Sequence, residues 1–218
     1  MKRTLVFVTA ALALGACATD PLTGESIWGN TGRGAAIGAI AGGIGGVFAG
    51  GNDGRNVAVG AAIGALAGGA VGRYMDGQEE DMRRATMNTG IGLQRNGDTI
   101  ELVMPSDVTF SKGSASLDAS FTPVLDQVAK SLNLYPKTTI DIVGFASTEG
   151  AEQANLDLSY RRAQSVSTYL QGKGVLGQRI ATGGMGEAQS GLAVYPDDTE
   201  AKRAQNRRVK VTLRPVVQ

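Results

Sequence analysis

The chain has 218 residues, enough for one ordinary domain with extensions, and its 21 Lys and Arg residues balance 20 Asp and Glu residues. This balance argues against a nucleic-acid-binding protein, which usually carries a clear basic excess. The sequence contains no histidine, which excludes Ser-His-Asp and Cys-His catalysis and counts against a zinc site. We therefore expect a protein that is not an enzyme, with no catalytic residue, no metal and no cofactor.

Residues 1–16 have the pattern of a secretory signal peptide. Met1-Lys2-Arg3 is basic, and the apolar run Leu5–Leu14 is too short to span a bilayer stably. The sequence LGAC that ends at Cys17 resembles a bacterial lipobox, which implies cleavage before Cys17 and acylation of that residue. Each buried CH₂ of an acyl chain contributes about 0.8 kcal/mol to anchoring. An ordinary signal peptide with an incidental cysteine is the alternative.

The residues after Cys17 form two segments. We expect residues 17–33 to be a lipidated tether, and Ala18 in place of Asp favours the outer membrane over inner-membrane retention, by resemblance to bacterial sorting rules. Residues 34–73 contain an internal repeat, AAIGAIAGG and AAIGALAGG, with glycines spaced by four. Glycines at this spacing share one helix face and allow close packing of backbones. The repeat predicts a glycine-zipper helical hairpin that inserts into the membrane or self-associates, with a flexible linker as the alternative.

Residues 74–90 become charged and are typical of a helix. Glu79 and Arg83 are spaced as an i,i+4 ion pair on such a helix. We expect this segment to be a helical linker that leads into a folded domain at 91–218.

The start of that domain predicts strands and a helix. Hydrophobic and polar residues alternate across residues 99–104, which is typical of a half-buried strand, and residues 92–95 could supply its partner. A helix should follow, with Asp118 or Ser120 as its N-cap and Pro123 in its first turn. Tyr135-Pro136 should end this helix.

The second half of the domain continues the alternation of elements. We expect a strand over Thr138–Phe145, a long helix over Ala151–Lys173, a short strand over Ile180–Met185 and a last strand over Val209–Leu213. Residues 186–205 should be a long polar loop. Strands that alternate with helices predict an α/β (α+β) fold, in which a sheet carries its helices on one face.

Two segments carry a resemblance to a known family. GFASTEGAEQANLDLSYRRAQSV at 144–166 and RAQNRRVKV at 203–211 resemble the peptidoglycan-binding domain of the OmpA family. The resemblance implies a β-α-β-α-β-β order for the C-terminal domain. Together with the lipobox, the glycine zipper and YMDGQEE at 74–80, nearly the whole mature chain resembles the YiaD-type outer-membrane lipoproteins. This implies a lipid-anchored protein with its C-terminal domain in the periplasm, where it binds peptidoglycan.

The resemblance also implies a binding site. Arg162 takes the place of the arginine that clamps a stem-peptide carboxylate, and a guanidinium fork suits that task. Asn155 and Leu158 should line the same pocket, and Phe145 stands where the family has His or Tyr. Ser147 stands where the family has the Asp that binds the amine of diaminopimelate.

The departure at Ser147 leaves the function open between two main interpretations. Serine brings no charge, and losing a charge-assisted hydrogen bond costs about 1.5–3 kcal/mol, a ten- to hundredfold change in affinity. Glu149 and Glu152 are close enough in sequence to substitute. The chain is then either a tether between the outer membrane and peptidoglycan, or an assembly protein whose domain has lost diaminopimelate binding. A wall-degrading enzyme is the weakest alternative.

Overall fold

The computed structural model describes residues 66, 70–111, 113–187 and 198–217. The expected signal peptide, Cys17 and its tether, and most of the glycine zipper lie outside these residues. Lipid attachment and the zipper hairpin therefore stay predictions. Within the described part of the chain, every helix is too short or too polar to cross a bilayer.

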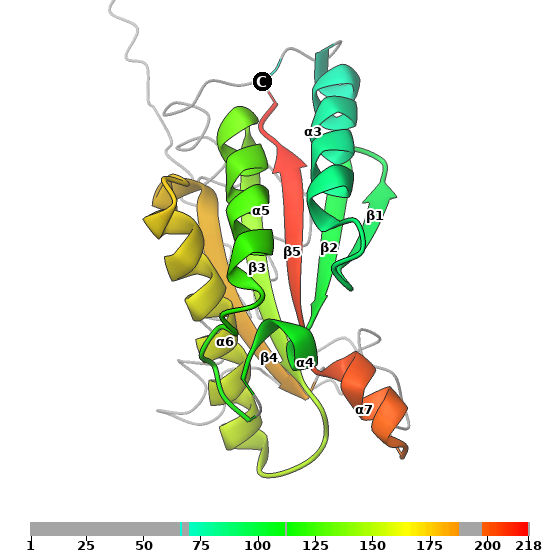
Figure 1. Ribbon diagram of the computed structural model, residues 1–218, viewed down its shortest axis with the longest axis vertical. Coiled ribbons are helices and arrows are strands. Elements are labelled where there is room, and N and C mark those ends of the chain that lie inside the picture. The colour runs from blue at the N-terminus through cyan, green and yellow to red at the C-terminus, as the bar shows by residue number, and fades with distance from the viewer. Residues whose placement is uncertain (1–65, 67–69, 112, 188–197, 218) are drawn as a thin grey trace, which may run out of the picture. The chain divides into compact units, whose positions relative to one another are not determined.

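A five-stranded sheet lies at the centre of the fold (Figure 1). The strands lie side by side in the order β1-β2-β5-β3-β4. Neighbouring strands are antiparallel except β3 and β4, which are parallel and are connected through a crossover helix. The strand bounds are β1 Gly92–Asn96, β2 Thr99–Pro105, β3 Thr138–Ala146, β4 Ile180–Glu187 and β5 Arg208–Pro215.

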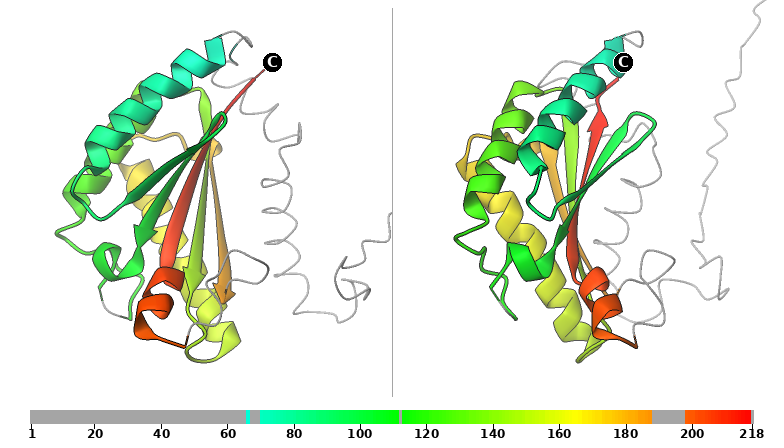
Figure 2. Two further views of the ribbon diagram at one scale, coloured as in Figure 1. Left: turned by 90° about the vertical axis from the view of Figure 1, so that its right-hand side faces the viewer. Right: turned by 45° about the vertical axis from the view of Figure 1, so that its right-hand side comes forward.

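Three long helices cover one face of this sheet (Figure 2). They are α3 (Val71–Thr86), α5 (Thr122–Leu134) and the crossover helix α6 (Glu152–Gly172). Two short helices, α4 (Ser106–Thr109) and α7 (Glu200–Asn206), lie at the end of the sheet where α6 begins. The predicted fold class is confirmed, since β2, α5, β3, α6, β4 and β5 follow the expected β-α-β-α-β-β order.

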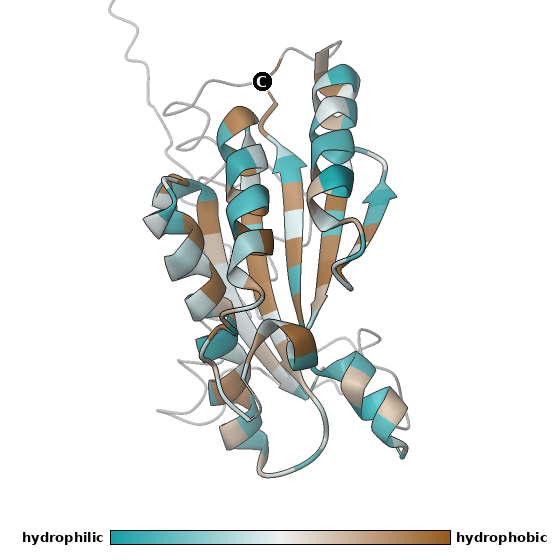
Figure 3. Ribbon diagram, in the orientation of Figure 1, coloured by the Kyte–Doolittle hydropathy of each residue, from teal (hydrophilic) through white to brown (hydrophobic). Residues whose placement is uncertain are grey.

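The hydrophobic core lies between the sheet and the helices. Figure 3 shows hydrophobic residues as bands on the strands beneath the helices. On β2 the predicted alternation is confirmed, because Ile100, Leu102 and Met104 are buried while their neighbours are partly exposed. The apolar faces of α5 and α6 pack onto these strands through Leu125, Val128, Leu132, Ala163, Val166 and Leu170.

Helix α6 lies unusually close to the sheet because two strand residues are glycines. A Cβ atom at Gly144 would clash with the backbone carbonyl of Ser159, and one at Gly184 would clash with the backbone of Tyr160. The same serine also binds the end of β4, since its Oγ accepts a hydrogen bond from the Gly186 N–H at 3.0 Å. The position of α6 is therefore set by backbone contact.

The start of α5 differs from the prediction. The helix begins at Thr122 after Phe121, and Pro123 occupies its first turn as expected. Asp118 and Ser120 form a turn before the helix, in which Asp118 Oδ1 accepts a hydrogen bond from the Ser120 N–H at 2.9 Å. The predicted capping role is wrong, because the Asp118 carboxylate accepts its hydrogen bond within this turn and no described side chain caps α5.

The expected loop over residues 186–205 also contains more structure than predicted. Strand β4 continues to Glu187, and α7 occupies the end of the segment. Thr199 caps this helix, because its Oγ1 accepts a hydrogen bond from the Lys202 N–H at 3.3 Å. The hydrophobic pattern missed α7 because ion pairs and a cap hold this short helix.

The segment expected as a helical linker forms α3, and the structure packs this helix into the domain. Met75 and Met82 are fully buried against the sheet. Tyr74 Oη accepts a hydrogen bond from the Lys137 N–H at 2.7 Å, and Gln78 Nε2 donates one to Thr138 Oγ1 at 3.3 Å. The packed unit therefore starts well before residue 91.

Candidate ligand-binding cleft

A cleft of about 690 Å³ lies at the end of the sheet that carries α4 and α7. Segments from four parts of the chain form it: α4 and the loop after it, the loop after β3, the first half of α6, and the region of α7. The lining residues are Ser106, Asp107, Phe110, Ser111, Gly113, Ala146, Ser147, Glu149, Asn155, Leu158, Arg162, Glu200 and Arg207. Four of the five residues expected at the binding pocket are among them.

Arg162 is the cation at the base of this cleft, with 5% of its surface exposed. Its Nε donates a hydrogen bond to the Ser114 carbonyl at 3.0 Å, and its guanidinium lies 5.3 Å from the centre of the Phe110 ring. Burial lowers the pKa of Arg162, and the nearby Asp107 partly opposes this effect. No carboxylate of the described residues forms an ion pair with it. A buried cation of this kind favours an anionic ligand.

Asn155 organises the loop after β3. Its Nδ2 shares its two N–H groups among three acceptors, the Ser147 carbonyl at 3.1 Å, the Glu149 carbonyl at 2.9 Å and Glu187 Oε1 at 3.0 Å. Only 8% of its surface is exposed. Asn155 therefore positions the loop against α6, and its amide is committed to that task.

The loop brings one acidic side chain to the cleft. Ser147 is buried and neutral, and Glu149, two residues further on, lines the cleft with 59% of its side chain exposed. Glu152, the other candidate substitute, is exposed at the first position of α6 and lies outside the described cleft lining. Of the two glutamates weighed from the sequence, the structure brings Glu149 to the site.

Asp107, Glu200 and Arg207 also line the cleft, and they form a network of ion pairs. Arg207 donates to both carboxylate oxygens of Asp107 at 3.3 and 3.1 Å, and to Glu200 Oε1 at 2.5 Å. The hydrogen bond to Asp107 raises the pKa of Arg207, and the bond from Arg207 lowers the pKa of Glu200. Glu200 lies on α7, so this pair joins that helix to the residue that precedes β5.

Phe145 does not join the described cleft lining. Side chains alternate along β3, so Phe145 points to the face opposite Gly144 and α6. Its ring is fully buried there beneath the guanidinium of Arg208, which lies 4.5 Å from the ring centre. Burial lowers the pKa of Arg208. The geometry of the strand thus removes Phe145 from the expected site.

Sequence reasoning did not indicate several other residues of the cleft, of which Asp107, Phe110 and Glu200 bear on its chemistry. Asp107 and Phe110 come from the segment around α4, far from Arg162 in the chain, and Glu200 comes from α7. Only the tertiary fold brings these segments together, so no local pattern indicates them. Among the described residues, no group of His, Cys, Asp and Glu has the arrangement of a metal site.

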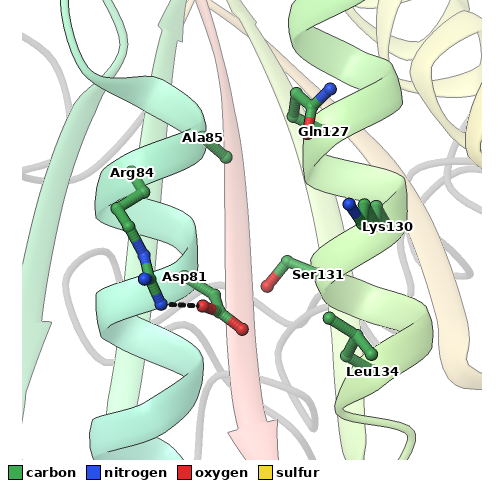
Figure 4. A pocket seen from close by; sticks show the side chains of 7 residues that line it. All are labelled: Asp81, Arg84, Ala85, Gln127, Lys130, Ser131 and Leu134. Carbon is green, nitrogen blue, oxygen red and sulfur yellow. Dashed lines mark hydrogen bonds and ion pairs between the residues drawn. The ribbon is translucent and has the colours of Figure 1, made fainter.

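A second hollow of about 380 Å³ lies between α3 and α5 (Figure 4). Asp81 and Arg84 on α3 pair with each other across its rim, and Ser131 on α5 has a buried hydroxyl without a partner in the described residues. Arg84 is well exposed to solvent. The hollow therefore offers no buried charge to a ligand, unlike the cleft at Arg162.

Comparison with known proteins gives matches over both halves of the chain. The OmpA family model matches residues 109–207, and the YMGG-like Gly-zipper model matches residues 1–76. The chain is 41% identical over 211 residues to the probable lipoprotein YiaD of Escherichia coli K12, covering 96% of this chain and 95% of that protein.

More distant similarities concern the C-terminal part. The peptidoglycan-binding protein ArfA of Mycobacterium tuberculosis H37Rv is 33% identical over 114 residues, which is 52% of this chain and 34% of ArfA. The crystal structure of a putative MotB-like protein from Desulfovibrio vulgaris aligns with a TM-score of 0.56 and 25% identity. That alignment covers 66% of this chain and 98% of the other.

Proposed function

Because this chain belongs to the YiaD-type lipoprotein family with an OmpA-like domain, we propose that it links the outer membrane to the cell wall by binding peptidoglycan non-covalently. Acylated Cys17 anchors the protein in outer-membrane lipid, the tether and glycine zipper follow, and the C-terminal domain lies in the periplasm. Self-association through the zipper is part of the same proposal.

The observation that carries the proposal is the burial of the Arg162 side chain at the cleft without a described carboxylate partner. Its guanidinium is almost fully buried, opens into the cleft, and forms no ion pair with a described carboxylate. Arginine keeps its charge at any physiological pH and presents parallel N–H donors that match a carboxylate. A stem peptide offers such carboxylates, and the name of the relative ArfA records peptidoglycan binding in a protein with similar sequence.

Co-sedimentation with diaminopimelate-type peptidoglycan tests the proposal on the full-length protein in detergent. The parent should sediment with the wall, and Arg162→Ala should remain in the supernatant. Arg161→Ala is the matched control, because Arg161 is 60% exposed and pairs with Asp157 at 2.8 Å outside the cleft. A parent that fails to sediment, or an Arg162→Ala protein that sediments equally well, would refute the proposal.

The second candidate function is that of an envelope assembly protein that has lost diaminopimelate binding. The neutral and buried Ser147 at the amine-binding position favours it. This alternative predicts oligomers whose formation depends on the zipper. It also predicts that neither the parent nor Arg162→Ala binds peptidoglycan.

A further inference from the structure

We propose that Glu149 binds the ammonium group of the ligand, the task that the family pattern gives to position 147. The inference rests on the proposed function and specifies its ligand. The cleft would select a stem peptide whose terminal diamino acid presents a free ammonium beside a carboxylate, over peptides without that ammonium.

The cleft carries two groups of charges, which we call its positive pole and its other pole. Arg162 is the positive pole and has no described carboxylate as its ion-pair partner. The other pole is a cluster of three carboxylates and two guanidinium groups: Asp107, Glu149, Glu200, Arg203 and Arg207. Counted over these described residues, the cluster has one carboxylate more than it has cations. A zwitterion therefore complements the cleft, with its carboxylate toward Arg162 and its ammonium toward the cluster.

Of the three carboxylates, Glu149 is the one most available to a ligand. Arg207 holds Asp107 through both carboxylate oxygens, and it holds Glu200 at 2.5 Å. Glu149 lies 3.8 Å from Arg207, and its short contact is with Arg203 Nε at 3.1 Å, an atom that also contacts Glu200 at 3.2 Å. An ammonium group can bind Glu149 without breaking a bidentate pair.

The loop after β3 places this carboxylate on the same framework as Arg162. Asn155 fixes the backbone at Ser147 and Glu149, and Asn155 and Arg162 lie two turns apart on one face of α6. Glu149 is the one charged residue between Gly144 and Gly150. The loop thus keeps one acid, displaced by two positions from the place where the family pattern has it.

Isothermal titration calorimetry on the full-length protein in detergent tests the inference with two probes. The first is the tripeptide L-Ala-γ-D-Glu-meso-diaminopimelate, and the second is the same peptide with its side-chain amine acetylated. The parent should bind the free amine about ten- to a hundredfold more tightly, the range of one charge-assisted hydrogen bond. Glu149→Gln should remove that preference by weakening the free-amine peptide alone.

Two further variants separate ligand binding from a structural role. Glu152→Gln removes a neighbouring exposed glutamate and should leave the preference intact. Ser147→Asp, added to Glu149→Gln, should restore the preference, because it returns a carboxylate to the position used by the family. If Glu149 served only to hold Arg203 and Arg207, both peptides would weaken equally and Ser147→Asp would restore nothing.

The outcomes distinguish this inference from the proposed function. A parent that binds through Arg162 while Glu149→Gln keeps the full preference overturns the inference and leaves the proposed function standing. A parent that binds neither probe and does not sediment with peptidoglycan overturns both.

Discussion

Replacing Arg162 by methionine should remove ligand binding at little cost in stability. The side chain would lose its hydrogen bond to Ser114, worth about 1.5–3 kcal/mol, and its contact with the Phe110 ring, worth about 1–2 kcal/mol. Against this, methionine avoids burying a cation that has no carboxylate partner in the described residues, a penalty of several kcal/mol. The two effects nearly offset each other, so the free energy of unfolding should stay within about 2 kcal/mol of the parent.

Arg179 provides the matched control because it is also buried but donates several hydrogen bonds to protein acceptors, whereas Arg162 donates one. It is 1% exposed, and it donates to the carbonyls of Leu132, Tyr135 and Thr138 and to Thr138 Oγ1 at 2.8–3.0 Å. Burial lowers its pKa to about 10. Arg179→Met leaves several buried acceptors unpaired and should cost about 3–5 kcal/mol.

Urea unfolding without ligand measures both variants. Arg162→Met should unfold near the parent midpoint, and Arg179→Met should unfold at a clearly lower urea concentration with an unchanged slope. If Arg162→Met proves as destabilising as Arg179→Met, then Arg162 is a structural residue and the reasoning from its unpaired charge fails.

Two further predictions follow from packing and charge. Gly144→Ala should destabilise the domain by about 2–3 kcal/mol, because the new Cβ would clash with the Ser159 backbone. Gly172→Ala is the control: its Cβ would have no neighbour within 4 Å, so stability should change by less than about 1 kcal/mol. Urea unfolding compares the two variants. Because the bond from Arg207 lowers the pKa of Glu200, this pair contributes stability that is present above pH 4.5 and is lost as pH falls through the lowered pKa. Thermal melts at a series of pH values should show that loss for the parent and a smaller one for Glu200→Gln.

The sequence predicted the elements whose signals are local. Alternation at Ile100, Leu102 and Met104 identified β2, and the apolar face of α5 identified its packing against the sheet. Arg162, Asn155 and Ser147 were expected in one pocket because the family pattern places them in one short stretch, and all three line the cleft. Asp107 and Arg207 meet across 100 residues of chain, so their pairing has no signal in either neighbourhood.

Where two arguments from the sequence disagreed, the geometry of the backbone decided. A strand over Thr138–Phe145 requires Phe145 to lie on the face opposite Gly144, because successive side chains alternate, whereas the family resemblance implied that Phe145 lies at the pocket. The structure follows the alternation, because Gly144 must face α6 for the helix to pack so closely. In α3, Met75 and Met82 are spaced by seven residues, which brings both to one helix face and in hindsight indicates packing.

The two ends of β5 separate the segment that precedes the domain from the cleft. At one end Arg207 precedes the strand and lines the cleft. At the other end the Leu66 N–H donates to the Val216 carbonyl at 2.8 Å, where the second zipper repeat joins the domain. Eight residues of antiparallel strand span about 27 Å. In a tether between membrane and wall, the ligand and the anchored segment would lie at opposite ends of this strand. Tension would then act along β5, and its hydrogen bonds to β2 and β3 would be loaded together in shear.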